Sequence, residues 1–98
     1  MNLRAAAEGQ NCVRCGSNDG TTVLAHYTGA RRLAYRGGFG IKVNDWIGAH
    51  LCGLCHRHMD TLSRDKEKRW EHSEEFLHCV ALTILRLAEQ EIIHAKRP

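Results

Sequence analysis

The sequence has no stretch of eighteen apolar residues, the length that a membrane-spanning helix would need. Its first residues, Met-Asn-Leu-Arg-Ala-Ala-Ala, lack the apolar segment of a secretory signal. It also has no internal repeat and no low-complexity segment. These absences argue against a membrane or exported protein, so we expect a reducing, cytoplasmic environment in which thiols persist.

Apolar side chains are unevenly placed, and the first seventy of the 98 residues are rich in glycine, charge and histidine. A dense apolar block follows at residues 76–93. A small domain of this kind buries little surface and usually needs disulfides or a metal ion to be stable. The length predicts a single domain, 1–98, with an arm or short helix at 1–10, a core at 11–62 and a helical extension at 63–98.

Five cysteines are available for this role, and four form C-x-x-C pairs: Cys12 with Cys15, and Cys52 with Cys55. Such a turn places two sulfurs on one side of a tetrahedron, so two turns complete a structural zinc site. The alternatives are free thiols or a redox pair, and a redox pair would need a thioredoxin-like context that is absent. Cys79 stands alone in an apolar segment, which is typical of a buried thiol that is no ligand.

Local patterns predict the elements around these pairs. In chain order they are a strand at 21–27, a long glycine-bearing loop at 28–40, a short strand or turn at 41–46, and a helix from Cys55 to about Leu62. A charged stretch at 63–71, either a helical extension or a linker, and an amphipathic helix from the N-cap Ser73 to about His94 follow. We expect this last helix to pack on the zinc core or on a second subunit, as in a homodimer.

Histidine is frequent, with seven residues, and two positions stand out. His26 ends the predicted strand, and His56 directly follows the last paired cysteine. His56 and Asp60 are four residues apart, so a helix would place both on one face, where they can hold a divalent cation. The structural alternatives are a strand-end histidine with a backbone partner for His26, a residue flanking the knuckle for His56, and a surface acid paired with Arg57 or Arg64 for Asp60.

The segment 26–42 is basic, and its cations alternate with aromatic residues. The cations are Arg31, Arg32, Arg36 and Lys42, and the aromatic residues are Tyr27, Tyr35 and Phe39. Cations neutralise phosphates and aromatic rings stack on unpaired bases, so this composition predicts nucleic-acid binding with weak sequence preference. The alternative is a solvated loop without a ligand.

The order of these features resembles the zinc-containing HNH endonucleases, which have the ββα-metal fold: Cys12-x-x-Cys15, His26 at a strand end, Asn44, and Cys52-x-x-Cys55-His56. More closely, the runs at 23–27 and 45–49 and the segment from Cys52 to Asp60 resemble a family of small phage and prophage proteins assigned as nucleases. The resemblance covers residues 10–62.

The resemblance implies an α+β fold with a treble-clef-like zinc core, and a metal-dependent endonuclease that hydrolyses DNA phosphodiesters in a bacterial host cell. His26 matches the general base, and Asn44 matches the asparagine that orients the loop of that base; the structural alternative for Asn44 is a turn residue. His56 and Asp60 match ligands of a catalytic Mg²⁺, Mn²⁺ or Ni²⁺, separate from the structural Zn²⁺.

One position departs from the HNH pattern. Many members carry an acidic residue or a second histidine directly before the base as a cation ligand, whereas this chain has Ala25. The cation would then depend on His56, Asp60, water and phosphate oxygens, or on His26 itself. A zinc-bound module without catalysis, binding nucleic acid or a protein partner, is the alternative function.

Overall fold

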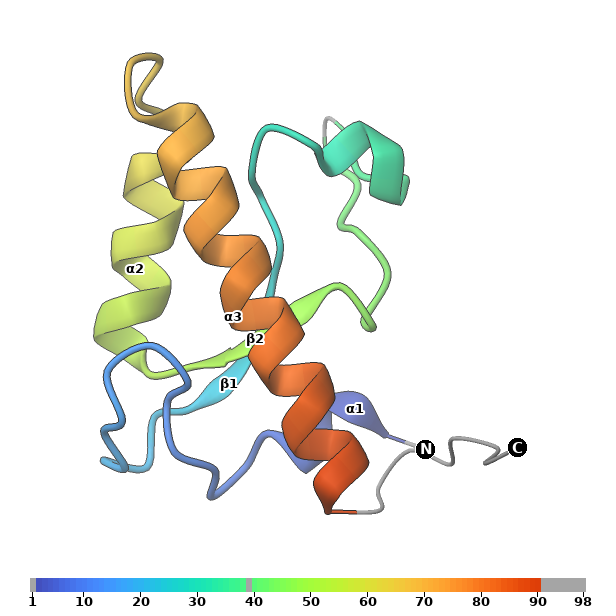
Figure 1. The fold of residues 1–98 in the computed structure, drawn as a ribbon, viewed down its shortest axis with the longest axis vertical. Coiled ribbons are helices and arrows are strands. Elements are labelled where there is room, and N and C mark those ends of the chain that lie inside the picture. The colour runs from blue at the N-terminus through green and yellow to red at the C-terminus, as the bar shows by residue number, and fades with distance from the viewer. Residues whose placement is uncertain (1, 39, 91–98) are drawn as a thin grey trace.

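The computed structural model describes residues 2–38 and 40–90 and has an α+β architecture. Its elements are α1 (Leu3–Ala6), β1 (Val23–His26), the 3₁₀ helix η1 (Arg32–Tyr35), β2 (Gly48–Leu51), α2 (Gly53–Leu62) and α3 (Arg69–Glu89). The helices surround a small sheet, and α3 runs along most of the molecule (Figure 1). Within the described residues, none of the helices combines the length and apolar character that crossing a membrane requires.

The sheet consists of β1 and β2, paired antiparallel with Ala25 opposite Ala49 and His26 opposite Gly48. Paired residues point to the same face, and successive residues point to opposite faces. Ala25 and Ala49 are fully buried in the main core, between the sheet and the long helices. His26 therefore lies on the other face from Ala25, at the end of β1.

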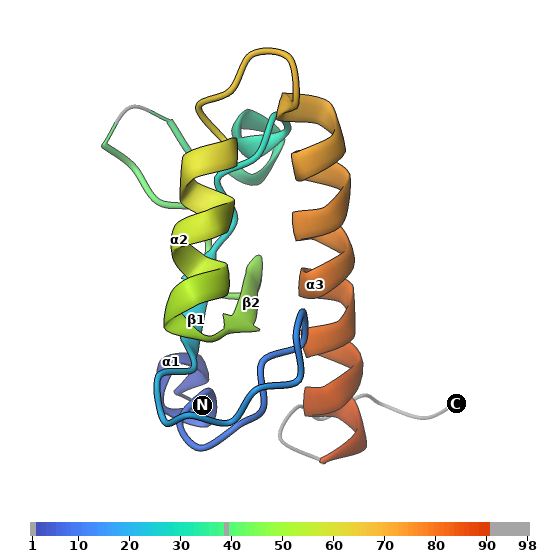
Figure 2. The ribbon, with the colours of Figure 1, turned by 90° about the vertical axis from the view of Figure 1, so that its left-hand side faces the viewer.

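The main core is closed by α2 on one side and α3 on the other, as Figure 2 shows. Its fully buried members include Leu51, Met59 and Phe76. A buried hydrogen-bond chain fixes α3 on β2: the Thr83 hydroxyl accepts from the His50 backbone N–H at 3.0 Å and donates to the Cys79 carbonyl at 2.9 Å. The C-terminal helix thus packs on the core, the first of the two packing arrangements that we expected.

The predicted N-cap of this helix is wrong, because α3 begins at Arg69 and Ser73 lies in its second turn. Ser73 is buried, and its hydroxyl hydrogen-bonds to the Tyr27 hydroxyl, which in turn accepts from the Arg31 N–H at 2.8 Å. A serine that looks like a cap in the sequence therefore serves as a tertiary contact between α3 and the segment after β1. The predicted end near His94 lies outside the described residues.

Three other boundaries differ from the sequence patterns. The helix expected from Cys55 begins at Gly53, because Cys52 is extended and takes the N-cap position. The second strand, β2, lies beyond the segment 41–46, which forms turns and one isolated bridge between Gly38 and Ile41. The long loop contains η1, a short helix that no periodicity indicated.

The short helix expected within residues 1–10 is present as α1. Asn2 caps it by accepting a hydrogen bond from the Ala5 N–H at 3.1 Å. Its buried residues Leu3 and Ala7 pack with Leu24 and with Leu87 of α3. This second, smaller cluster joins the N-terminal segment to Leu24, on the face of β1 that also carries His26.

Candidate metal centre and histidine pocket

The four paired cysteines meet at one point although 36 residues separate the two pairs in sequence. Their sulfurs all lie within 4.8 Å of one another, and Cys15 Sγ is 3.7 Å from Cys52 Sγ. A tetrahedral ion with Zn–S bonds of about 2.3 Å separates its sulfurs by about 3.8 Å. The cluster can therefore hold a metal ion such as zinc.

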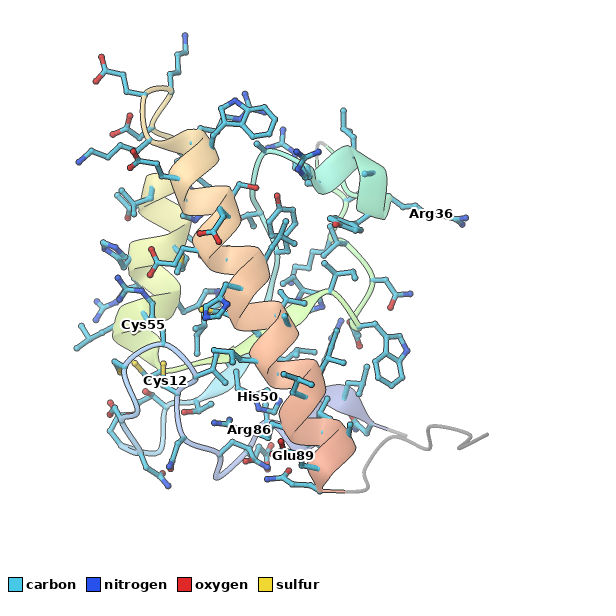
Figure 3. All side chains as sticks on the ribbon, viewed as in Figure 1. Cys12, Arg36, His50, Cys55, Arg86 and Glu89 are labelled. Carbon is cyan, nitrogen blue, oxygen red and sulfur yellow. The ribbon has the colours of Figure 1, made fainter. Side chains whose placement is uncertain are left out.

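Local backbone geometry presents the sulfurs. In the first knuckle the Gly16 N–H donates to the Cys12 carbonyl at 2.9 Å, and Gly16 has a positive φ of 79°, which favours glycine. The Val13 N–H donates to the His50 carbonyl at 2.9 Å and ties this knuckle to β2. Figure 3 shows Cys12 and Cys55 facing one another across this junction.

The pKa values of the clustered thiols differ from one another. Burial opposes ionisation of Cys12, but backbone hydrogen bonds at Cys52, Cys15 and Arg14 outweigh it and lower the pKa of this thiol to about 6. Burial raises the pKa of the Cys55 thiol to about 12. All four sulfurs become thiolates only when a bound cation balances their charge, which is the chemistry of a metal site.

Arg14, inside the first knuckle, connects the cysteine cluster to α3. Its Nη1 donates to Cys55 Sγ at 3.5 Å, and its Nε lies 2.6 Å from Oε1 of Glu75. The sequence pattern did not predict this contact. The only signal was an arginine between two paired cysteines, which gives no indication of its distant partner.

His26 has a carboxylate partner that the sequence analysis also missed. Its Nε2 lies 2.7 Å from Oδ1 of Asp45, and its side chain is only 13% exposed. Arg4 of α1 approaches the other oxygen of Asp45 at 3.4 Å. The hydrogen bond from His26 is the main reason that the pKa of Asp45 lies below its usual range.

This pairing determines the tautomer of neutral His26. An ionised carboxylate can only accept a hydrogen bond, so the proton of the neutral imidazole must lie on Nε2. Nδ1 is then unprotonated and can accept a proton. A histidine held in this way has the form that a general base needs.

Asn44 builds the turn that presents Asp45. Its Oδ1 accepts from the Trp46 N–H at 2.9 Å, and its carbonyl accepts from the Ile47 N–H at 2.9 Å. The approach of this turn to the sheet also requires Gly48, because a Cβ there would lie 2.7 Å from Leu24 Cδ1. Asn44 thus adjoins Asp45 in this turn, and its hydrogen bonds go to the backbone of the turn.

A cavity of about 440 Å³ adjoins this pair. His26 lines it from the end of β1, and Asp60 lines it from α2. The rest of the wall comes from the segment 27–43 and from the end of α2: Tyr27, Thr28, Arg32, Gly37, Gly38, Gly40, Ile41, Lys42, Val43, Ser63 and Arg64. The fold therefore brings His26 and Asp60, two predicted site residues that are 34 positions apart in the sequence, to one cavity.

His56 lies beside Asp60 rather than in the cavity wall. Its Nε2 is 3.4 Å from Asp60 Oδ2, and both side chains are partly exposed. Two neighbouring ligands of an octahedral ion with bonds of about 2.1 Å lie about 3 Å apart, so this pair suits one ion. Within residues 2–38 and 40–90, however, the four cysteines are the only group of three or more histidine, cysteine or acidic ligands close enough to share an ion.

The four predicted nucleic-acid contacts divide into two sets. Arg32 and Lys42 line the cavity. Arg31 instead packs its guanidinium over the ring of Trp70 on α3, 5.4 Å from the ring centroid. Arg36, at the end of η1, extends away from the molecule (Figure 3).

A cysteine cluster that can hold a metal ion at one end of a small sheet, and a carboxylate-held histidine at the other end beside a pocket with charged side chains, define a class of compact α+β proteins. Comparison with family models identifies the particular family: residues 1–91 match the model described as "Putative nuclease YbcO", and the chain belongs to this family. Searches among curated proteins and among solved structures gave no match.

Proposed function

We propose that this protein is a metal-dependent DNA endonuclease of the HNH type, with a structural zinc in the four-cysteine cluster. One observation carries the proposal: His26, held by Asp45, lines the same cavity as Asp60 of α2. Two antiparallel strands are followed by a helix. One cysteine pair precedes β1, and the other lies where β2 passes into α2. This order supports a treble-clef core of the ββα-metal kind. Membership of a nuclease family supports nucleic acid as the substrate.

In this proposal His26 takes a proton from a water molecule through Nδ1, and the resulting hydroxide attacks a backbone phosphorus. The bond from that phosphorus to the leaving ester oxygen breaks, and the leaving oxygen takes a proton from solvent. Asp45 keeps the imidazole in the required tautomer and stabilises it once it is protonated. Asn44 is a positioning residue, because it shapes the turn that carries Asp45.

His56 and Asp60 would hold the catalytic cation on the exposed side of α2. When bound, such a cation offsets the negative charge that grows on the phosphate and on the leaving oxygen. Ala25 contributes no ligand, because its methyl side chain has no donor atom; it is also fully buried on the opposite face of β1 from His26. Water and phosphate oxygens would complete the coordination, which predicts weak cation binding in the absence of substrate.

The test is a nicking assay on supercoiled plasmid with Mg²⁺, Mn²⁺ or Ni²⁺, comparing the native protein with His26→Ala. We expect the variant to lose about 10²-fold or more of the rate, since a general base contributes roughly 10²–10⁴. His78→Ala is the matched control, because His78 is an exposed histidine of α3 outside the cavity.

Equal rates for the native protein and His26→Ala would overturn the catalytic assignment. If neither nicks DNA while both bind it, the protein is a nucleic-acid-binding module without catalysis. Activity that falls only in His26→Ala supports the proposal.

A further inference from the structure

The cavity beside His26 has three cationic side chains in its wall, and they come from three separate parts of the chain. Arg32 belongs to η1, Lys42 precedes β2, and Arg64 follows the last residues of α2. The sequence pattern 26–42 pointed to the first two of these and to two other arginines. It gave no reason to include Arg64, which lies more than twenty residues further along the chain.

These three charges are not neutralised by the protein. Among the ion pairs of the described residues, none includes Arg32, Lys42 or Arg64. The one carboxylate in the wall is Asp60, whose ion-pair contact is with His56 at 3.4 Å. Three cations that converge on one cavity against one carboxylate leave a net positive site, which favours an anion.

The rest of the wall suits a nucleotide rather than a bare anion. Ile41 and Val43 give the cavity an apolar side, and the Thr28 and Ser63 side chains give it hydroxyl groups. A volume of about 440 Å³ lies in the range of pockets that enclose small organic ligands. A phosphate together with its adjoining sugar and base matches this combination of charge, hydroxyl groups and apolar surface.

We infer that Arg32, Lys42 and Arg64 bind one backbone phosphate of a nucleic-acid strand in this cavity, next to His26. The inference deepens the proposed function, on which it rests, and assigns Arg64 as a binding residue. It also removes two arginines from the contact set, because Arg31 is packed on Trp70 and Arg36 extends away from the molecule.

The test compares Arg64→Gln with Arg36→Gln, a variant that removes the same charge outside the cavity. The probe is a fluorescein-labelled single-stranded DNA oligonucleotide of mixed sequence, with no added divalent cation so that no cleavage occurs. Fluorescence anisotropy gives the affinity across a salt series from about 50 to 200 mM. Each phosphate contact contributes about 0.7 to the slope of log affinity against log salt for a single strand.

We expect Arg64→Gln to weaken binding roughly tenfold at low salt and to reduce the slope by about 0.7, with Arg36→Gln close to native. Thermal unfolding checks that Arg64→Gln retains the native fold, because Arg64 also adjoins the C-terminus of α2. Native-like affinity and slope in Arg64→Gln, or an equal loss in Arg36→Gln, would overturn the inference.

The binding assay is independent of the nicking assay, so the two failures can be told apart. If the native protein nicks no plasmid but Arg64→Gln weakens DNA binding, the proposed catalysis is refuted and the phosphate site stands. Normal nicking by the native protein, with DNA binding that does not depend on Arg64, would refute the phosphate site alone.

Discussion

Asp45 is the residue that gives His26 a defined chemical form. Its carboxylate accepts a hydrogen bond from Nε2 at 2.7 Å, and its other oxygen is approached by Arg4 of α1. The ring can then neither rotate freely nor place its proton on Nδ1 without losing a charge-assisted bond. The N-terminal helix thereby contributes indirectly to the pocket, since Arg4 helps to fix Asp45.

We predict that Asp45→Asn lowers the nicking rate about 10²-fold or more while the protein stays folded. The asparagine keeps the shape of the side chain but can donate as well as accept, so it no longer selects the tautomer. Loss of the negative charge also makes the imidazolium less stable. The acidic limb of the pH–rate profile should therefore move to lower pH.

Glu71→Gln provides the control, because it removes one negative charge from an exposed position in the first turn of α3. A purely structural role for Asp45 would lower activity without moving the pH profile. That outcome, or full activity in Asp45→Asn, would remove Asp45 from the proposed mechanism.

Buried His50 contrasts with His26, although both lie in the sheet. Burial, together with the nearby charge of Arg86, lowers the pKa of His50 to about 4, so the ring is neutral at physiological pH. Its Nδ1 accepts from Nη1 of Arg86 at 3.1 Å, and Figure 3 shows the two side chains side by side under α3. His50 therefore supports the contact between α3 and β2.

At the scale of elements, one buried hydroxyl group gives the contact between α3 and β2 a polar anchor. Thr83 Oγ1 accepts from the His50 N–H and donates to the Cys79 carbonyl one helical turn earlier. The Thr83 side chain thus gives a polar partner to a buried strand N–H group that faces a helix. A wholly apolar side chain at this position would leave that N–H group without a partner.

We predict that Thr83→Val lowers the free energy of unfolding by about 1–3 kcal/mol, because the side chain keeps its shape while the buried N–H of His50 loses its acceptor. Urea denaturation followed by circular dichroism measures the change. The same substitution at Thr61, exposed on α2, should change stability by less than about 0.5 kcal/mol. Equal effects at the two sites would show that the hydrogen bond to β2 has no special weight.

At the scale of the whole molecule, the cysteine cluster joins the N-terminal segment to the start of α2 and, through Arg14, to α3. Cys12 and Cys15 belong to the N-terminal segment, Cys52 and Cys55 begin α2, and Arg14 extends the junction to α3. Metal binding at such sites contributes on the order of 10 kcal/mol. Net stabilities of small domains are only about 5–15 kcal/mol, so the fold as a whole should depend on the ion.

We therefore predict that the purified protein carries one zinc ion, and that Cys55→Ala abolishes metal binding and unfolds at least the segment up to α2. Elemental analysis gives the metal content, and circular dichroism with thermal melting gives the folded fraction. Cys79→Ala is the control: this thiol is buried in the core but outside the cluster, so the variant should keep its zinc and its fold. An unchanged melting curve after chelation of the native protein would contradict the prediction.

The sequence by itself determined the parts of this protein that depend on local spacing. C-x-x-C turns, a strand-forming run before His26 and an apolar helical stripe after residue 75 follow from neighbours a few residues apart, and the structure has all three. The i, i+4 relation of His56 and Asp60 is likewise a property of one helix, and their 3.4 Å separation follows from it. The roles proposed for these two residues and for His26 stay predictions.

Only the tertiary structure decided which distant groups meet. Asp45 reaches His26 because the antiparallel pairing of β1 with β2 brings the turn before β2 back to the end of β1. Ser73 was misread as a cap because a local pattern contains no information about the Tyr27 hydroxyl, which lies 46 positions away. Arg64 lines the cavity only because the fold places the end of α2 and the end of β1 around the same space. Spacing along the chain fixes local geometry. Hydrogen-bond and charge partners that are distant in sequence meet only through tertiary packing, which depends on the whole fold.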